Sequence, residues 1–141
     1  MSAHIGQQNY QDDAGKLLLR VALALLLLFH GISKMTGGVG FISAMLAKAG
    51  LPGFLAYLVY VGEVVAPLLI LVGLFTRAAA AVVVINMIVA FLLVHTGDVF
   101  TLSKTGGWAL ELQGMYLVTA LVLAMMGAGR FSIGGTAGRF N

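Results

Sequence analysis

Cysteine is absent from the 141-residue sequence, which excludes disulfides, thiolate metal ligands and cysteine nucleophiles. Charged side chains are also scarce: they make up 9% of the chain, against about a quarter of an average soluble domain. No flavin, haem or nucleotide motif occurs. The few basic residues are scattered and form no basic cluster with interleaved aromatic residues, so nucleic acid is not an expected partner.

Hydrophobic residues, by contrast, make up 60% of the chain, more than a soluble domain of this size accommodates. They form four long runs, one starting at Leu17 and the others at about residues 53–75, 78–95 and 108–128. Helices of about 20 residues cross the hydrocarbon core of a bilayer, and no run shows the alternation of a barrel strand. The sequence therefore predicts an all-α membrane protein, a bundle of four transmembrane helices in contact with the lipid bilayer.

The loops divide the chain further. We expect a polar N-terminal tail at residues 1–16, one transmembrane domain at 17–129 and a C-terminal tail at 130–141. Only Thr76 and Arg77 lie clearly between the second and third runs, so those helices should form an antiparallel hairpin. The longest loop, between the first two spans, has apolar residues at helical spacing and predicts a short interfacial helix ended by Gly50 and Pro52. Those residues are Phe41, Ile42, Met45, Leu46 and Ala49.

Positive charges near the span ends predict the orientation, because cytoplasmic loops are enriched in lysine and arginine. An even number of spans places both termini on one side of the membrane. Five basic residues lie on that side and three on the other, which favours cytoplasmic termini in a bacterial inner membrane. We expect Arg20, near the start of the first span, to extend towards the interface. The two groups are Lys16, Arg20, Arg77, Arg130 and Arg139, against Lys34, Lys48 and Lys104.

Glu63 is the clearest candidate for function, because it lies about ten residues into the second span and ionisable groups at that depth are costly. Pro67, four residues later, lacks the amide that would bond to the Glu63 carbonyl. A polar, interrupted point in a membrane helix suggests a cavity or pathway. The alternative is a buried, hydrogen-bonded structural glutamate.

Four other side chains should join Glu63 in the outer half of the bundle: His30, Lys34, His95 and Glu111. We expect them to form an outward-facing, substrate-binding cluster, with His30 as the partner of Glu63 because it lies one turn deeper than Lys34. For His95, Lys34 and Glu111 the alternative is ordinary interfacial charge, since helix ends tolerate charge.

Two amides should play structural roles, namely Asn86, bonded across helices, and Gln113. Asn86 lies nine residues from His95, on the opposite side of a straight helix, and Gln113 and Glu111 likewise point to different sides. Two histidines and two glutamates could bind a metal, but they come singly from four helices without a Glu-x-x-His spacing. No metal site is therefore expected.

The order and spacing of several short motifs resemble the DoxX family of small four-helix membrane proteins, over roughly residues 17 to 133. The motifs are Arg20, then the stretches at residues 30–34 (HGISK), 50–52 (GLP), 62–63 (GE), 73–77 (GLFTR), 107–111 (GWALE) and 127–133 (GAGRFSI). Many members have an aspartate two residues after the serine, where this chain has Gly134. The resemblance implies a bacterial inner-membrane protein of oxidoreductase type, related to subunits of thiosulfate:quinone oxidoreductase.

Three functions stay open from the sequence. A redox-associated subunit would supply a quinone or small-molecule pocket or anchor a soluble redox partner, and this is what the resemblance implies. A transporter or channel for a small solute or proton would use Glu63 as a relay. A structural or scaffolding subunit, alone or as a homo-oligomer, would use its polar groups only to hold helices together, and small residues such as Gly62, Ala66 and Gly73 fit that function equally well.

Overall fold

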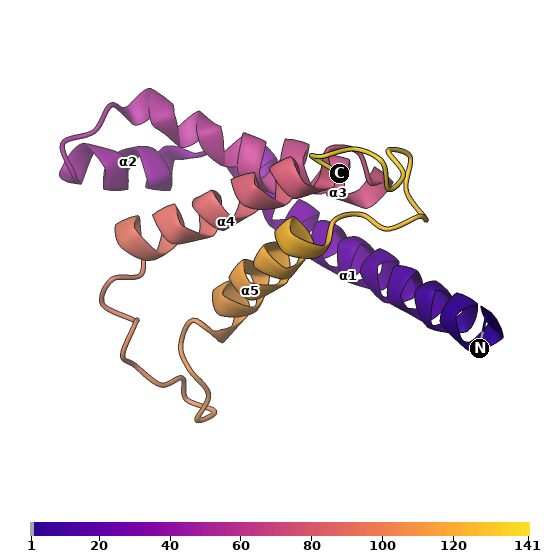
Figure 1. Ribbon diagram of the computed structural model, residues 1–141. Coiled ribbons are helices and arrows are strands. Elements are labelled where there is room, and N and C mark those ends of the chain that lie inside the picture. The colour runs from indigo at the N-terminus through magenta and orange to yellow at the C-terminus, as the bar shows by residue number, and fades with distance from the viewer. Residues whose placement is uncertain (1) are drawn as a thin grey trace.

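The computed structural model describes residues 2–141, and every regular element in that part of the chain is helical (Figure 1). The five α-helices are α1 (Ser2–Gly37), α2 (Gly40–Lys48), α3 (Ala66–Val72), α4 (Thr76–Leu93) and α5 (Glu111–Met126). A 3₁₀ helix, η1 (Gly53–Leu58), and a π-helical turn, η2 (Val61–Val65), precede α3. Residues 94–110 form a long loop whose only bridge in the described chain pairs Leu102 with Trp108.

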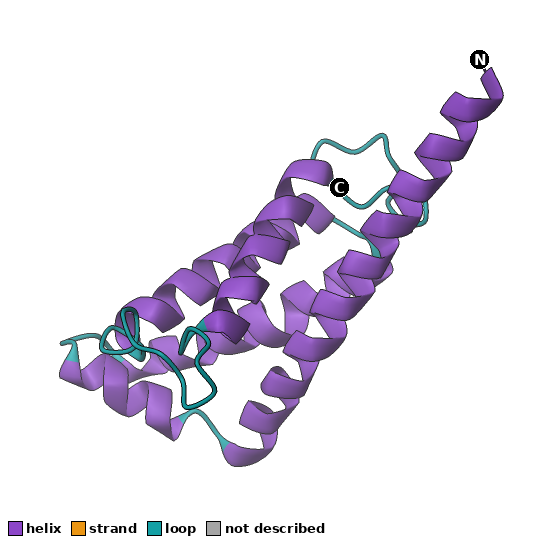
Figure 2. Ribbon diagram, turned by 90° about the horizontal axis from the view of Figure 1, so that it is seen from below, coloured by secondary structure: helices purple, strands orange, loops and turns teal. Residues whose placement is uncertain are grey.

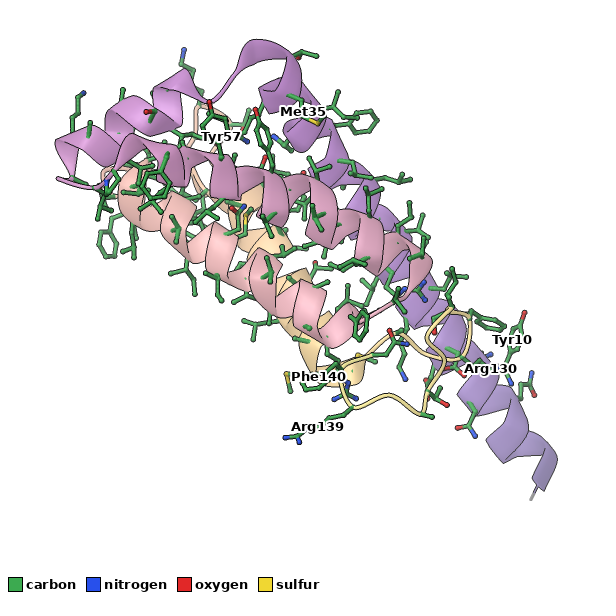
Figure 3. The ribbon with its side chains drawn as sticks, turned by 90° about the horizontal axis from the view of Figure 1, so that it is seen from above. Tyr10, Met35, Tyr57, Arg130, Arg139 and Phe140 are labelled. Carbon is green, nitrogen blue, oxygen red and sulfur yellow. The ribbon has the colours of Figure 1, made fainter. Side chains whose placement is uncertain are left out.

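Helix α1 is longer than its apolar part, because the expected polar tail is itself helical and continuous with the first span. Its N-terminal turns extend beyond the other helices (Figure 2). Where the extension meets the C-terminal segment, Arg130 forms an ion pair with Asp13, with a distance of 3.3 Å between Nε and Oδ2. The Arg130 guanidinium also lies 5.1 Å from the ring centroid of Tyr10, and Figure 3 shows Tyr10 and Arg130 close together beside the C-terminal segment. This cluster ties the start of α1 to the C-terminal segment.

The second span changes geometry along its length. Residues Gly53–Val72 run as η1, η2 and then α3. Pro67 has no amide hydrogen, so the Glu63 carbonyl cannot receive the usual bond from four residues later. The turn before Pro67 is π-helical, and the Ala66 amide donates to the Val61 carbonyl across five residues. Glu63 therefore lies on a widened turn, as the position of Pro67 suggested.

The second and third spans form the expected antiparallel hairpin, but the link lies earlier than the sequence suggested. Thr76 and Arg77 belong to the first turn of α4, and the connection is Gly73–Phe75. Gly73 ends α3 in the left-handed conformation, with φ of 74°, which glycine adopts without steric cost. The error arose because Thr76 and Arg77 are polar, yet they begin a helix rather than a turn.

The core is built from small and branched residues on four helices, with α4 between α3 and α5 (Figure 1). Small side chains let helices approach closely where lipid supplies no hydrophobic drive between them. The buried members are Leu23, Ala24 and Leu27 of α1, Ala66 and Ile70 of α3, Ala79, Ala80, Val83 and Met87 of α4, and Tyr116, Ala120 and Leu123 of α5. A smaller cluster around Val39, Leu46 and Ala56 holds α2 against η1.

Arg20 is buried, with 1% of its surface exposed, and does not extend to the interface as the sequence suggested. Its guanidinium donates four hydrogen bonds of 2.9–3.0 Å to carbonyl oxygens. Two acceptors lie in the last turn of α3 and two in the segment after α5. A cation is favoured at helix C-termini, where unsatisfied carbonyls gather. The acceptors are the carbonyls of Ile70, Leu71, Ala128 and Phe131.

In the described part of the chain, three helices are long and apolar enough to cross a membrane: Asn9–Gly37, Gly53–Val72 and Thr76–Leu93. The fourth expected span, α5, is apolar but has only 16 residues. At about 1.5 Å per residue it covers roughly 24 Å, less than a hydrocarbon core of about 30 Å. The short helix expected between the first two spans is present as α2.

Candidate functional site

A cavity of about 810 Å³ lies at the end of the bundle that carries α2 and the 94–110 loop. Its walls come from the end of α1, the residues from Phe41 to Glu63, the second half of α4 and the start of α5. Most lining side chains are aliphatic. The polar exceptions come from four different segments of the chain: His30, Lys34, Glu63, Asn86, His95, Gln113 and Tyr116.

Glu63 is the polar centre of this cavity. Its side chain is 9% exposed, and Oε2 accepts a hydrogen bond of 2.5 Å from the Lys34 ammonium. Its other oxygen, Oε1, lies 3.5 Å from the Asn86 amide nitrogen on α4. Gly62 leaves room for Asn86, because a Cβ at residue 62 would meet the Asn86 side chain at 2.5–2.7 Å. One carboxylate oxygen is thus held by a cation, and the other lies at the limit of hydrogen-bonding distance from an amide.

The sequence placed the wrong side chain against Glu63. Gly31 packs directly on the Glu63 backbone carbonyl, where a Cβ would collide with it. Lys34, three residues after Gly31, lies on the same face of α1 and reaches the carboxylate, helped by its long aliphatic stem. His30 lies about 40° around the helix from Lys34, and its shorter side chain packs against Tyr116 instead. The close packing at Gly31 brings α1 against the Glu63 turn, and the longer side chain of Lys34 reaches the carboxylate.

His30 instead lies against Tyr116 of α5. The two rings meet edge to face, with centroids 5.8 Å apart. Both side chains line the cavity, and neither has a hydrogen bond to protein among the contacts of residues 2–141. Two polar aromatic groups are therefore available to a ligand beside the Lys34–Glu63 pair.

His95 forms a second polar point in the cavity wall. Its Nδ1 lies 3.2 Å from Oδ2 of Asp98, and its Nε2 lies 3.5 Å from the Gln113 amide nitrogen. His95 and Asn86 both line the cavity, although they are nine residues apart. The expectation that they point in opposite directions assumed one straight helix, whereas α4 ends at Leu93 and His95 lies in the loop.

Glu111 does not join the cluster. It begins α5, is exposed and lies beside Gly107, outside the cavity. A carboxylate in the first turn of a helix is stabilised by the helix dipole, which accounts for this residue without a ligand. Gln113, two residues later, does face the cavity, as the different directions of these two side chains predicted.

Metal ligands are not grouped in this part of the molecule. Among the side chains that the structure describes, no three histidine, aspartate or glutamate residues lie close enough together to hold a metal ion. The acidic and basic groups of the cavity pair with each other instead, as Lys34 and Glu63 do.

Sequence reasoning missed Tyr116 and Asp98. Both could have been found from residues already singled out, since Tyr116 lies three residues after Gln113 and Asp98 three after His95, spacings that bring side chains to one face of a helical turn. Tyr60 lies outside the cavity lining, but its hydroxyl donates a 3.0 Å hydrogen bond to the Lys34 carbonyl and so fastens the end of α1 to the second span.

Comparison with known proteins gives a consistent result. The DoxX family profile matches residues 15–96. The chain is 30% identical over 120 residues to a Bacillus subtilis (strain 168) protein named "Putative oxidoreductase CatD", an alignment that covers 85% of this chain and 84% of the relative. It is 33% identical over 122 residues to an uncharacterised protein of Haemophilus influenzae, covering 79% of this chain and 81% of that one. No solved structure matches significantly. Since the profile spans more than half of the sequence and the Bacillus relative aligns over most of both lengths, the chain belongs to the DoxX family.

Proposed function

We propose that this protein is a four-span subunit of a bacterial inner-membrane redox system, and that its cavity binds a small hydrophobic molecule of the quinone class. The chain would supply the binding site, and a soluble or membrane partner would supply the electrons. The resemblance of the whole chain to a relative named as an oxidoreductase supports the redox assignment.

The observation that carries the proposal is the chemistry of the cavity. A quinone has a flat apolar body and two carbonyl oxygens that accept hydrogen bonds. The aliphatic walls suit the body, while Lys34 of α1 and Gln113 and Tyr116 of α5 offer hydrogen-bond donors. The Lys34–Glu63 pair adds a fixed dipole, which orients a polar head in a water-poor site.

Filling the cavity is expected to abolish quinone binding. Ala90 lines it from α4, and an indole there would occupy the space of the ligand. With the purified full chain in nanodiscs, binding of decylubiquinone is measured by calorimetry, and Ala90→Trp should weaken it at least roughly tenfold, the effect of about 1.4 kcal/mol. Ala81→Trp, on the same helix but exposed and outside the cavity, is the matched control and should bind like the wild type.

Equal affinity of Ala90→Trp and Ala81→Trp for decylubiquinone would overturn the assignment of the ligand to this cavity. Absence of quinone binding, combined with solute or proton flux in liposomes that is lost in Glu63→Gln, would instead favour a carrier. The discontinuous second span supports the carrier function, because transporters often have their binding sites where a membrane helix is interrupted.

The proposed topology places the cavity end outside and the termini in the cytoplasm. The cavity lies at the end that carries Met35 and Tyr57, away from Arg130 and Arg139 (Figure 3). Because the chain has no cysteine, a single introduced one reports its own side of the membrane. In intact cells, Ala47→Cys should react with a membrane-impermeant maleimide and Ala137→Cys only after lysis, both residues being exposed. The reverse pattern would invert the topology and place the cavity on the cytoplasmic side.

A further inference from the structure

The loop after α4 carries a histidine held in one orientation. The Asp98 carboxylate can only accept hydrogen bonds when ionised, so the 3.2 Å contact assigns the ring hydrogen of His95 to Nδ1. Its Nε2 then presents a lone pair, which accepts from the Gln113 amide at 3.5 Å. This second bond is long and therefore weak. A ligand hydroxyl in the cavity can replace it with a shorter one.

We propose that His95 is the proton acceptor of the cavity and that its ligands carry an aromatic hydroxyl, as phenols and hydroquinones do. Asp98 is the positioning residue. This inference rests on the proposed function, since it requires that a small molecule occupies the cavity. It makes that function more specific in two ways: the ligand carries a hydroxyl group that donates a proton, and His95 accepts that proton.

The proton transfer needs no oxidant or reductant. The ligand O–H bond breaks, its electron pair stays on oxygen, and the proton bonds to Nε2 of His95. The product is an aryl-oxide anion beside an imidazolium, and the Asp98 carboxylate offsets the new positive charge. Asp98 is about half exposed, so the proton has a way out to water through the loop.

The charges around His95 favour this direction. On its own loop the charged residues are Asp98, which contacts His95, and Lys104, which is exposed, while α5 presents the neutral Gln113. Further into the cavity, Lys34 and Glu63 neutralise each other as a pair. His30 and Tyr116 complete the titratable lining, and Glu111 lies outside the cavity. The nearest unbalanced charge is thus the Asp98 carboxylate, whose Oδ2 lies 3.2 Å from Nδ1 of His95.

The test uses 7-hydroxy-4-methylcoumarin, a phenolic probe whose neutral and ionised forms have different excitation wavelengths. The full chain in nanodiscs is titrated with pH at saturating protein, and the excitation ratio reports the ionised fraction of bound probe. Wild-type protein should shift the ionisation equilibrium of the probe towards the anion by roughly tenfold, which corresponds to about 1.4 kcal/mol. His95→Gln should still bind the probe but lose the shift, and Asp98→Asn should lose most of it because the ring tautomer is no longer fixed.

Glu111→Gln is the matched control, because it removes a charge from the same end of the protein outside the cavity, and it should keep the full shift. A shift that survives in His95→Gln, or bound wild-type probe that ionises like the free compound, would overturn this inference and leave the cavity assignment intact. A wild type that binds decylubiquinone but not the phenolic probe would also overturn this inference alone. Failure to bind either compound, or equal binding of them by Ala90→Trp, would overturn the proposed function and the inference with it.

Discussion

Replacing Lys34 with methionine is expected to destabilise the folded protein by about 3 kcal/mol, the lower end of the cost of breaking a buried ion pair. The substitution keeps an unbranched chain of similar length but leaves the Glu63 carboxylate in an apolar cavity without its cation. The Asn86 amide, at 3.5 Å, is too distant to compensate. The free energy of unfolding is measured by titration with denaturing detergent from mixed micelles.

The double variant Lys34→Met/Glu63→Gln should recover most of this loss, because a neutral amide no longer needs a cation. Lys48→Met is the matched control, since Lys48 is exposed at the end of α2 and should change stability by less than about 0.5 kcal/mol. A double variant no more stable than Lys34→Met would show that the ammonium contributes through packing rather than through its charge.

The helical fold could be predicted from the sequence because a chain that crosses lipid must satisfy all its backbone hydrogen bonds internally. Runs of apolar residues without alternation allow only helices, and the order of five α-helices follows from where those runs are interrupted. What the sequence could not give was the geometry at the interruptions. The 3₁₀ and π-helical turns before Pro67, and the end of α4 at Leu93, depend on packing around them.

Most residues of the candidate site could be predicted from the sequence, but the contacts between them could not. Scarcity of polar residues made Glu63, His30, Lys34 and His95 stand out, and all four line one cavity. Which of them touch depends on the rotation of each helix, and here Gly31 sets it by contact with the Glu63 carbonyl. A one-residue change in the position of that glycine would turn another face of α1 towards the second span.

Arg20, at the other end of the bundle, is a second residue whose contacts could not be predicted from the sequence. An arginine near the start of a span usually extends to the interface, and nothing in its neighbours marks this one as buried. Its acceptors come from residues 50 to 111 positions later in the chain. Gly73 makes the space for it, because a Cβ there would lie 2.6 Å from Nη2 of Arg20. Only the packed structure brings these segments together.

Arg20→Lys is therefore expected to be more damaging than its conservative appearance suggests. The planar guanidinium donates in several fixed directions, to Ile70 and Leu71 of α3 and to Ala128 and Phe131 after α5. A single ammonium cannot reach both segments at once. Each buried carbonyl left without a donor costs about 1–3 kcal/mol, so losing two of the four would cost roughly 2–6 kcal/mol.

Detergent-titrated unfolding measures this loss, and Arg139→Lys, at an exposed position in the C-terminal segment, is the control that should leave stability unchanged. Because Arg20 lies outside the cavity lining, the fraction of Arg20→Lys that remains folded should bind decylubiquinone with wild-type affinity. Lowered affinity in that fraction would mean that the α3 end, held by Arg20, also sets the shape of the cavity through the Glu63 turn. Unchanged stability would show that lysine and water together satisfy the four carbonyls, and the fork geometry of arginine would then be unnecessary for the fold.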